Sequence, residues 1–422
     1  MARIAFAWEL GGEYGHAMAC AGLARSLNAQ GHHIGLMFRE LRQLAFLPET
    51  TAYELFQAPR SMREGAVPAM PASFAELLLG MGYADPADLC ARLGAWRALL
   101  SHWRADLLIA DFAPTALLAA RLLDLKRVTF GNGFFTPPRL SPLPAFRIDE
   151  PIAPERLVAT DRQALAAANA ALARFGAPPL ERLSEQFEVE EDFLCTFPEL
   201  DHYGSRPASG YWGPRFRADR GLELEWPAGG GKCVFVYVKR DLAQLDALLE
   251  CLARQSNRVI AFIPELEAAR RARFAARSRI AAERPVRLDS LLKRCDLLIG
   301  HGGEIATAAL MHGVPQLSFP MHYEQYLTAR RLEQIGSGAW LSPAASEAQI
   351  AAAIEGLLAE ERFGAAAKAF ARRYAAFSPQ EQRRRIVARI AQILAAPRSR
   401  ALPLPDAPPI LSPSSTIQGD KQ

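Results

Sequence analysis

Short apolar runs alternate with helical patterns from the start of the chain. Residues 3–8 (RIAFAW) form an apolar run, residues 15–31 have helical spacing, and residues 32–38 (HHIGLMF) are again strand-like. A strand, a helix and a second strand in this order predict a βαβ unit. The same rhythm returns over residues 105–132, so we predict a doubly wound α/β domain in the first half.

A second α/β run follows a segment rich in glycine and proline. Residues 203–217 (YGSRPASGYWGPRFR) and 226–232 (WPAGGGK) are the best linker candidates. Apolar strands and helices then alternate from residue 232 to residue 303. We therefore predict an N-terminal domain over 1–215 and a C-terminal domain over 216–395.

The end of the chain has a different composition. Residues 346–377 and 378–396 are amphipathic, and Ser378 before Pro379 is typical of a helix N-terminus. We interpret the basic residues as the solvated face of helices packed on the protein. Peripheral contact with a membrane surface is the alternative. The tail 396–422 is too poor in core-forming residues to fold, and we expect it to be disordered.

Two insertions in the first half are strongly apolar or aromatic, over residues 70–100 and 133–148. Insertions after strand ends commonly line ligand pockets, although simple core packing explains the same composition equally well. The side chains concerned are Met81, Tyr83, Phe134, Phe135 and Phe146.

Charge and cysteine content narrow the class of partner. The formal net charge of the 422 residues is only +4, and basic residues do not interleave with aromatics, so we expect no nucleic-acid partner. The six cysteines form no CxxC pair, which favours a reducing, cytoplasmic compartment. The apolar segment at the start of the chain is too short for a signal peptide. No window approaches the roughly 20 apolar residues of a membrane span.

The strongest chemical signal is the stretch 296–325 (DLLIGHGGEIATAALMHGVPQLSFPMHYEQ). An apolar strand ends at His301, Gly302 and Gly303, and a helix begins at once. Glycines allow a ligand to approach the backbone, and the helix N-terminus favours phosphate. His301 and Thr307 would add hydrogen bonds, unless the turn serves only to pack strand against helix.

A second strand exit follows about twenty residues later and leads to Glu324 and Gln325. Ligands of open α/β sheets collect at the carboxyl ends of the strands. A carboxylate beside a carboxamide suits hydroxyl groups, so we predict a sugar next to the phosphates.

With these motifs the sequence resembles the family-1 type nucleotide-sugar glycosyltransferases of GT-B fold, which include macrolide glycosyltransferases. The family's signature of strand, H-x-G-x-x-x-T, helix, G-V-P, proline and D/E-Q is matched in order and spacing by His301, Gly303, Thr307, Gly313, Val314, Pro315, Pro320, Glu324 and Gln325. The resemblance implies two Rossmann-like domains facing each other across a cleft, with C-terminal helices packing back toward the N-terminal domain. It also implies a nucleoside-diphosphate sugar as donor.

The resemblance further implies a catalytic pair in the N-terminal domain. His16 occupies the place of the family's general base, and Asp111 that of the carboxylate that orients it, with Asp106 as the weaker candidate. A histidine has the right pKa range for taking a proton from an acceptor hydroxyl. Without the resemblance, a capping or packing role would explain each residue.

Four departures from the family pattern concern the donor side. Ile305 and Ala306 replace a polar Asn and Ser, and Arg287 and Leu288 replace the Pro-Gln pair beside the nucleobase. Lys239 and Arg240 stand in a turn where they would neutralise a diphosphate or merely be solvated. Glu304 stands where plant relatives have a bulky tryptophan. Its side chain would either point away from the anion and favour the positive helix end, or face the cleft and repel the diphosphate.

Together these features predict an inverting glycosyltransferase that moves a sugar to a hydroxyl of an apolar small molecule or lipid. The chain contains no Asp-x-Asp metal motif, so we expect neither a metal nor a cofactor. The alternatives are a GT-B nucleotide-sugar epimerase and a non-catalytic nucleotide-sugar-binding protein. The pattern does not reveal the nucleobase, the sugar or the oligomeric state.

Overall fold

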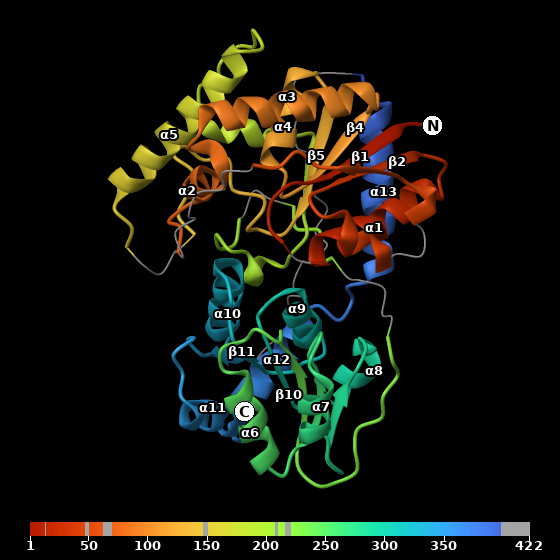
Figure 1. Ribbon diagram of the computed structural model, residues 1–422, viewed down its shortest axis with the longest axis vertical. Coiled ribbons are helices and arrows are strands. Elements are labelled where there is room, and N and C mark those ends of the chain that lie inside the picture. The colour runs from red at the N-terminus through yellow and green to blue at the C-terminus, as the bar shows by residue number, and fades with distance from the viewer. Residues whose placement is uncertain are drawn as a thin grey trace, which may run out of the picture.

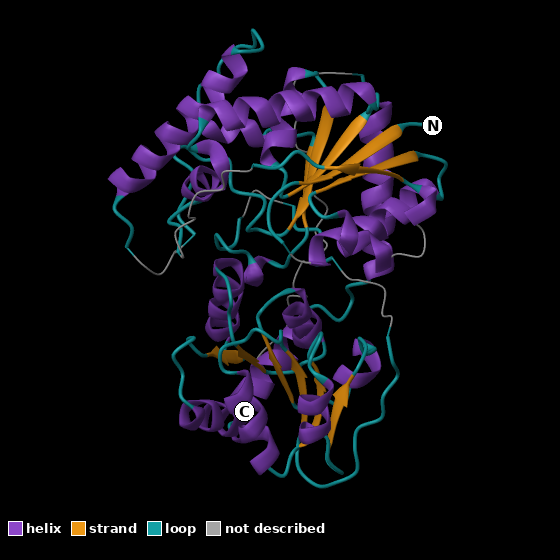
Figure 2. Cartoon of the chain, in the orientation of Figure 1, coloured by secondary structure: helices purple, strands orange, loops and turns teal. Residues whose placement is uncertain are grey.

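Two parallel sheets, one in each half of the chain, organise the protein (Figure 1). The computed structural model describes residues 1–12, 14–46, 50–61, 70–146, 151–206, 210–215 and 221–397. Most of the predicted disordered tail therefore lies outside the described residues. Figure 2 shows helices flanking the strands in both halves, as expected for α/β domains.

The first sheet has six parallel strands in the order β3-β2-β1-β4-β5-β6. In the register of β1 with β4, Trp8 is paired with Asp111. The strands β1, β2 and β4 are nearly continuous apolar runs because helices cover both faces of the sheet. Their bounds are β1 (Arg3–Trp8), β2 (His33–Phe38), β3 (Glu54–Gln57), β4 (Leu107–Asp111), β5 (Lys126–Gly131) and β6 (Glu191–Leu194).

The second sheet repeats this topology, in the order β12-β11-β10-β7-β8-β9. The strand order reverses direction between β1 and β4 in the first sheet, and between β7 and β10 in the second. Ligands of such sheets bind outside the carboxyl ends of the strands at these switch points. The bounds are β7 (Cys233–Tyr237), β8 (Arg258–Phe262), β9 (Arg279–Ala282), β10 (Leu297–Gly300), β11 (Gln316–Ser318) and β12 (Gly338–Trp340).

The apolar insertion at 70–100 forms two helices separated by a sharp turn. The turn spans Leu79–Tyr83, and Gly82 has φ +101, which favours glycine. Asp85 then caps the next helix by accepting hydrogen bonds from two backbone N–H groups. The helices of this half are α1 (Tyr14–Asn28), α2 (Phe74–Leu78), α3 (Pro86–His102), α4 (Pro114–Leu122) and α5 (Pro154–Ala173).

The predicted helical stretch at 346–377 is divided into two helices. Glu360 has extended dihedral angles, φ −83 and ψ 109, and it ends one helix and begins the next. The helices of this half are α6 (Leu245–Arg254), α7 (Ala268–Phe274), α8 (Leu288–Leu292), α9 (Glu304–Met311), α10 (Tyr323–Ile335), α11 (Glu347–Ala359) and α12 (Glu361–Arg373).

The last helix, α13 (Pro379–Ala395), returns to the N-terminal half and lies beside α1 (Figure 1). Ser378 caps it, as predicted, by accepting a hydrogen bond from Glu381 N. Its buried side chains join the apolar core on one face of the first sheet, and Lys126 Nζ donates to carbonyls at its C-terminal end. The predicted return of the C-terminal helices to the N-terminal domain is thus confirmed.

Among the described residues, no helix is long and apolar enough to cross a membrane.

Candidate active site

His16 and Asp111 meet at the switch point of the first sheet. Asp111 is the last residue of β4, and His16 stands in the first turn of α1, which follows β1. His16 Nδ1 lies 3.0 Å from Asp111 Oδ2, with side chains 8% and 0% exposed. Phe112, directly after Asp111, has φ +50, a strained conformation that its backbone hydrogen bond from Leu10 helps to hold.

Aromatic side chains surround His16. Its ring stacks on Trp8 with a centroid distance of 5.3 Å and meets the edge of Phe135 at 4.7 Å. Gly11 has φ +78, and a Cβ there would lie 3.2 Å from His16 Nε2. Because residue 11 is a glycine, it has no side chain that would crowd His16 Nε2.

Arg215 joins this pair to the second domain. Arg215 Nη1 lies 2.7 Å from Asp111 Oδ2, and Nη2 lies 3.2 Å from Glu304 Oε1. Burial would raise the pKa of Asp111, but Arg215 and then His16 outweigh burial and lower it. Burial would lower the pKa of Arg215, but the two carboxylates raise it. Asp111 is therefore ionised at neutral pH.

His301, in the glycine turn after β10, hydrogen-bonds to residues that follow two neighbouring strands, β7 and β11. His301 Nε2 accepts a hydrogen bond from Lys239 N at 2.7 Å, and Nδ1 donates to Phe319 O at 2.7 Å. The ring therefore has a protein partner at each nitrogen and orients the turn. Gly302 has φ +85, and a Cβ there would lie 2.9 Å from Gln325 O, so the turn requires glycine.

Gly303 is the N-cap residue of α9 and provides no side-chain cap. The positive end of the helix dipole lies at this N-terminus. Thr307 and Glu304 stand beside it, and both line the pocket. Glu304 thus faces the cleft. It pairs with Arg215 instead of standing as an isolated negative charge.

The Glu-Gln pair at the start of α10 is divided between two tasks. Glu324 Oε1 accepts a hydrogen bond from Asn132 Nδ2 of the first domain at 2.7 Å. Gln325 Oε1 instead accepts one from Met321 N at 2.9 Å and closes the turn before the helix. Only Glu324 of the pair lines the pocket.

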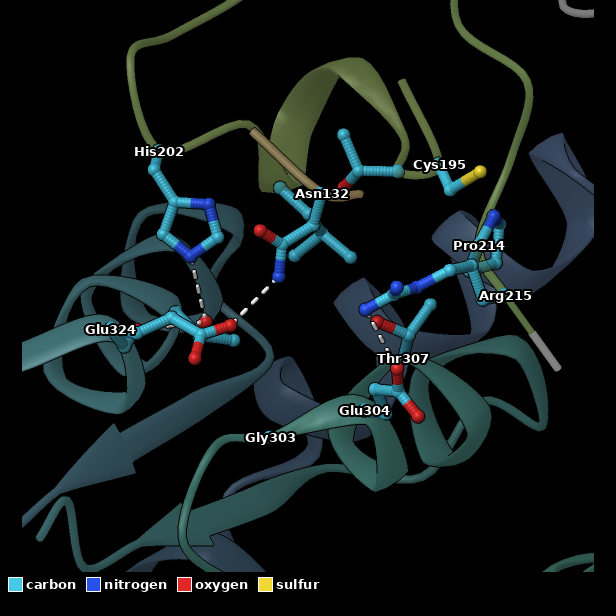
Figure 3. A pocket seen from close by; sticks show the side chains of 12 residues that line it. Asn132, Cys195, His202, Pro214, Arg215, Gly303, Glu304, Thr307 and Glu324 are labelled. Atoms are coloured by element: carbon cyan, nitrogen blue, oxygen red, sulfur yellow. Dashed lines mark hydrogen bonds and ion pairs between the residues drawn. The ribbon is translucent and has the colours of Figure 1, made fainter. Parts of the chain in front are cut away.

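A small pocket, open to solvent, lies between the two domains (Figure 3). Figure 3 shows Asn132 directed at Glu324, and Arg215 directed at Glu304. A third contact joins His202 Nε2 to Thr328 Oγ1 at 3.2 Å. The lining residues are Asn132, Cys195, Thr196, Leu200, His202, Pro214, Arg215, Gly303, Glu304, Thr307, Glu324 and Thr328.

Other predicted donor residues lie outside this pocket. Arg240 is exposed and pairs with Glu265 at 3.5 Å, while Lys239 contributes its backbone N–H to His301. Arg287 pairs with exposed Glu223. Leu288 packs against the core of the second domain as the first residue of α8.

The predicted acceptor side chains belong to the core of the first domain. Phe134 stacks on Phe146 with a centroid distance of 4.7 Å, and Met81 packs against the same core. Tyr83 Oη accepts a hydrogen bond from Gln186 Nε2 at 2.6 Å and is 1% exposed. Phe135 is the member of the set that contacts His16.

Known proteins share sequence with parts of this chain. Residues 246–389 match the family described as erythromycin biosynthesis protein CIII-like, C-terminal domain. Demethyllactenocin mycarosyltransferase of Streptomyces fradiae is 44% identical over 59 residues, and NDP-glycosyltransferase YjiC of Bacillus subtilis (strain 168) is 44% identical over 52. These alignments cover 14% and 12% of this chain and 13% of each relative.

The likeness to solved structures extends over nearly the whole chain. Spinosyn rhamnosyltransferase SpnG has a TM-score of 0.64 at 18% identity, covering 93% of this chain and 99% of SpnG. The fold is therefore GT-B, with two Rossmann-like domains. The GT-B fold expected from the sequence is thus confirmed, and the family match covers residues 246–389 of the second domain.

Proposed function

We propose that the protein is an inverting glycosyltransferase that moves a sugar from a nucleoside-diphosphate sugar to an acceptor hydroxyl. The observation that carries this proposal is the position of the His16–Asp111 pair. It lies at the first sheet's switch point, and Arg215 connects it to the glycine turn of the second domain. A proton acceptor and an anion-binding helix terminus thus share one site.

In this proposal His16 is the general base. The Asp111 carboxylate beside Nδ1 favours the tautomer with its proton on Nδ1, so that Nε2 accepts the acceptor's hydroxyl proton. Asp111 also stabilises the imidazolium that forms. The hydroxyl oxygen then attacks the anomeric carbon from the side opposite the nucleoside diphosphate, which leaves with its bonding electrons and inverts the configuration.

The donor would lie between α9 and α10. The diphosphate would occupy the N-terminus of α9 at Gly303 and Thr307, where the helix dipole stabilises negative charge. The sugar hydroxyls would reach Glu324. The described residues contain no group of three or more metal-ligating side chains. In this proposal the dipole of α9 and the Arg215 guanidinium stabilise the negative charge of the departing nucleoside diphosphate.

The chemical classes of donor and acceptor are also proposals. SpnG has been solved with thymidine diphosphate and with spinosyn aglycone. By similarity of fold we propose a nucleoside-diphosphate sugar and a small-molecule acceptor. The aromatic side chains around His16 favour an apolar acceptor.

A binding protein without activity is the second candidate. Ala306 is buried and Ile305 packs against the core of the second domain, so neither side chain hydrogen-bonds a diphosphate. Donor binding would then depend on the backbone of the turn. A protein with this site could hold a nucleotide sugar without transferring it.

One experiment separates these candidates. The protein is incubated with dTDP-, UDP- and GDP-linked sugars and a panel of apolar alcohols, and release of nucleoside diphosphate is measured. We expect release with one donor class, reduced about 10²- to 10⁴-fold in His16→Ala and unchanged in His33→Ala, a control at an exposed histidine. Tight donor binding without release would favour the binding protein, and neither binding nor release would overturn both.

A further inference from the structure

Arg215 is a buried cation held between carboxylates of two domains. Its side chain is 5% exposed, with one guanidinium nitrogen on Asp111 and another on Glu304. The ion pairs connect the switch point of the first sheet to the first turn of α9. The cation thus touches both halves of the proposed active site.

The charges that line the pocket conflict with the proposed donor. Among the described residues that line it, Arg215 is the one Lys or Arg, while Glu304 and Glu324 are acidic. A diphosphate at the N-terminus of α9 would arrive where the Glu304 carboxylate already pairs with the guanidinium. Because like charges repel, the diphosphate and the Glu304 carboxylate would compete for this guanidinium nitrogen.

We propose, on the basis of the proposed function, that Arg215 binds the donor diphosphate and that Glu304 takes the diphosphate's place in the donor-free protein. On binding, a phosphate oxygen replaces Glu304 at Nη2, while Nη1 stays on Asp111. The exchange is non-covalent and replaces the ion pair with Glu304 by a charge-assisted hydrogen bond to a phosphate oxygen. A planar guanidinium suits both anions.

Burial determines which carboxylate is displaced. The Asp111 side chain is 0% exposed, so it would lose its partner without gaining water. The Glu304 side chain is 27% exposed and can be rehydrated after it leaves the guanidinium. The exchange is therefore expected at Glu304, and the contact with Asp111 is kept.

The same geometry makes Arg215 a link between donor and general base. Asp111 Oδ2 lies 3.0 Å from His16 Nδ1 and 2.7 Å from Arg215 Nη1. A donor bound to the guanidinium is then aligned with the histidine through one shared carboxylate. The sequence pattern placed Arg215 in a linker and gave it no role.

The test is calorimetric titration of thymidine, uridine and guanosine diphosphates into the full chain and its variants, with the corresponding nucleosides as phosphate-free controls. We expect Glu304→Gln to bind the diphosphate several-fold tighter, because the competing anion is gone. Arg215→Gln should bind it at least about tenfold more weakly, and in the double variant the gain from Glu304→Gln should vanish. Nucleoside affinity should not change.

Two further variants keep the result interpretable. Glu324→Gln removes a pocket carboxylate that lies on another helix and accepts its hydrogen bond from Asn132. This variant should leave diphosphate affinity nearly unchanged; a gain equal to that of Glu304→Gln would mean a general charge effect and overturn the proposal. If Arg215→Gln does not fold, Arg215→Lys retains the charge without the planar fork and should still bind more weakly.

The failures of the two proposals are distinguishable. A wild-type chain that binds none of the three diphosphates overturns the proposed function and this inference with it. A wild-type chain that binds one of them, with the same affinity in the Glu304 and Arg215 variants, overturns only the role of Arg215.

Discussion

The carboxylate of Asp111 lies 3.0 Å from His16 Nδ1, fully buried behind the histidine. We expect Asp111→Asn to lower kcat about 10²- to 10⁴-fold, since a neutral amide cannot stabilise the imidazolium. His16→Ala should cost a similar factor. Residues that act as a unit are non-additive, so the double variant should lose little more than either single one. Additive losses in steady-state kinetics would contradict a shared role.

The burial of His202 should make stability depend on pH. Burial, then the charges of Arg331 and Arg206, lowers the pKa of His202 from 6.5 to about 3. The folded protein keeps this ring neutral, whereas the unfolded chain binds a proton below pH 6.5. Stability tied to His202 is thus full above pH 6.5 and is lost as pH falls toward 3.

Urea unfolding at two pH values checks this dependence. From pH 7 to pH 5 the wild type should lose about 2 kcal/mol more than His202→Gln. The comparison cancels the contributions of the other histidines. Equal losses in the two proteins would show that His202 is protonated in the folded state.

Glu324 should affect the sugar and not the diphosphate. It accepts a hydrogen bond from Asn132 across the cleft and lies on a different helix from the glycine turn. We expect Glu324→Gln to lower kcat/KM for the nucleotide sugar about 10- to 100-fold, the value of a charged hydrogen bond. The dissociation constant of the free nucleoside diphosphate, measured by calorimetry, should be retained; a parallel loss would place Glu324 at the phosphates.

The two glycines of the turn give a matched pair of variants. Gly302 has φ +85, and a Cβ added there would lie 2.9 Å from a backbone oxygen, whereas a Cβ added at Gly303 would meet nothing within 4 Å. Gly302→Ala should lower the free energy of unfolding by about 1–3 kcal/mol. Gly303→Ala should keep its stability but bind nucleoside diphosphate more weakly, because its methyl group intrudes where the ligand approaches. Urea unfolding and calorimetry separate the two effects.

The packing of α13 can be tested at Ile390, which is 0% exposed in the core of the first domain. Ile390→Ala should lower the free energy of unfolding by about 2–5 kcal/mol through the cavity it leaves. Arg384 lies on the exposed face of the same helix. Arg384→Ala should change stability by no more than about 0.5 kcal/mol, and a similar loss in both variants would contradict the packing.

The sequence predicted the parts of the fold that local patterns determine. Apolar strands, the glycine turn and the cap at Ser378 are each encoded in a few consecutive residues. The division at Glu360 was missed because amphipathic spacing continues across it. The pairing of His16 with Asp111 was expected from the family resemblance alone.

Arg215 was missed for a physical reason. Its two partners are 104 and 89 residues away along the chain, and no local periodicity marks such a contact. It stands in a Gly-Pro segment whose composition is typical of a linker. Arg240 shows the opposite case: a cation at a strand exit is a natural candidate for an anion site, yet it pairs with Glu265 on the surface. Side-chain direction in turns depends on tertiary contacts.

The return of α13 affects how the protein can be made. Ile386, Val387, Ile390 and Ile393 complete an apolar core whose other members come mostly from the first 130 residues. A ribosome releases these four side chains only after the strands and the other helices of the second domain. The N-terminal domain therefore keeps one face of its sheet only partly covered, by α1, until almost the entire second domain has been translated. A fragment ending at residue 215 would lack the helix that completes this core.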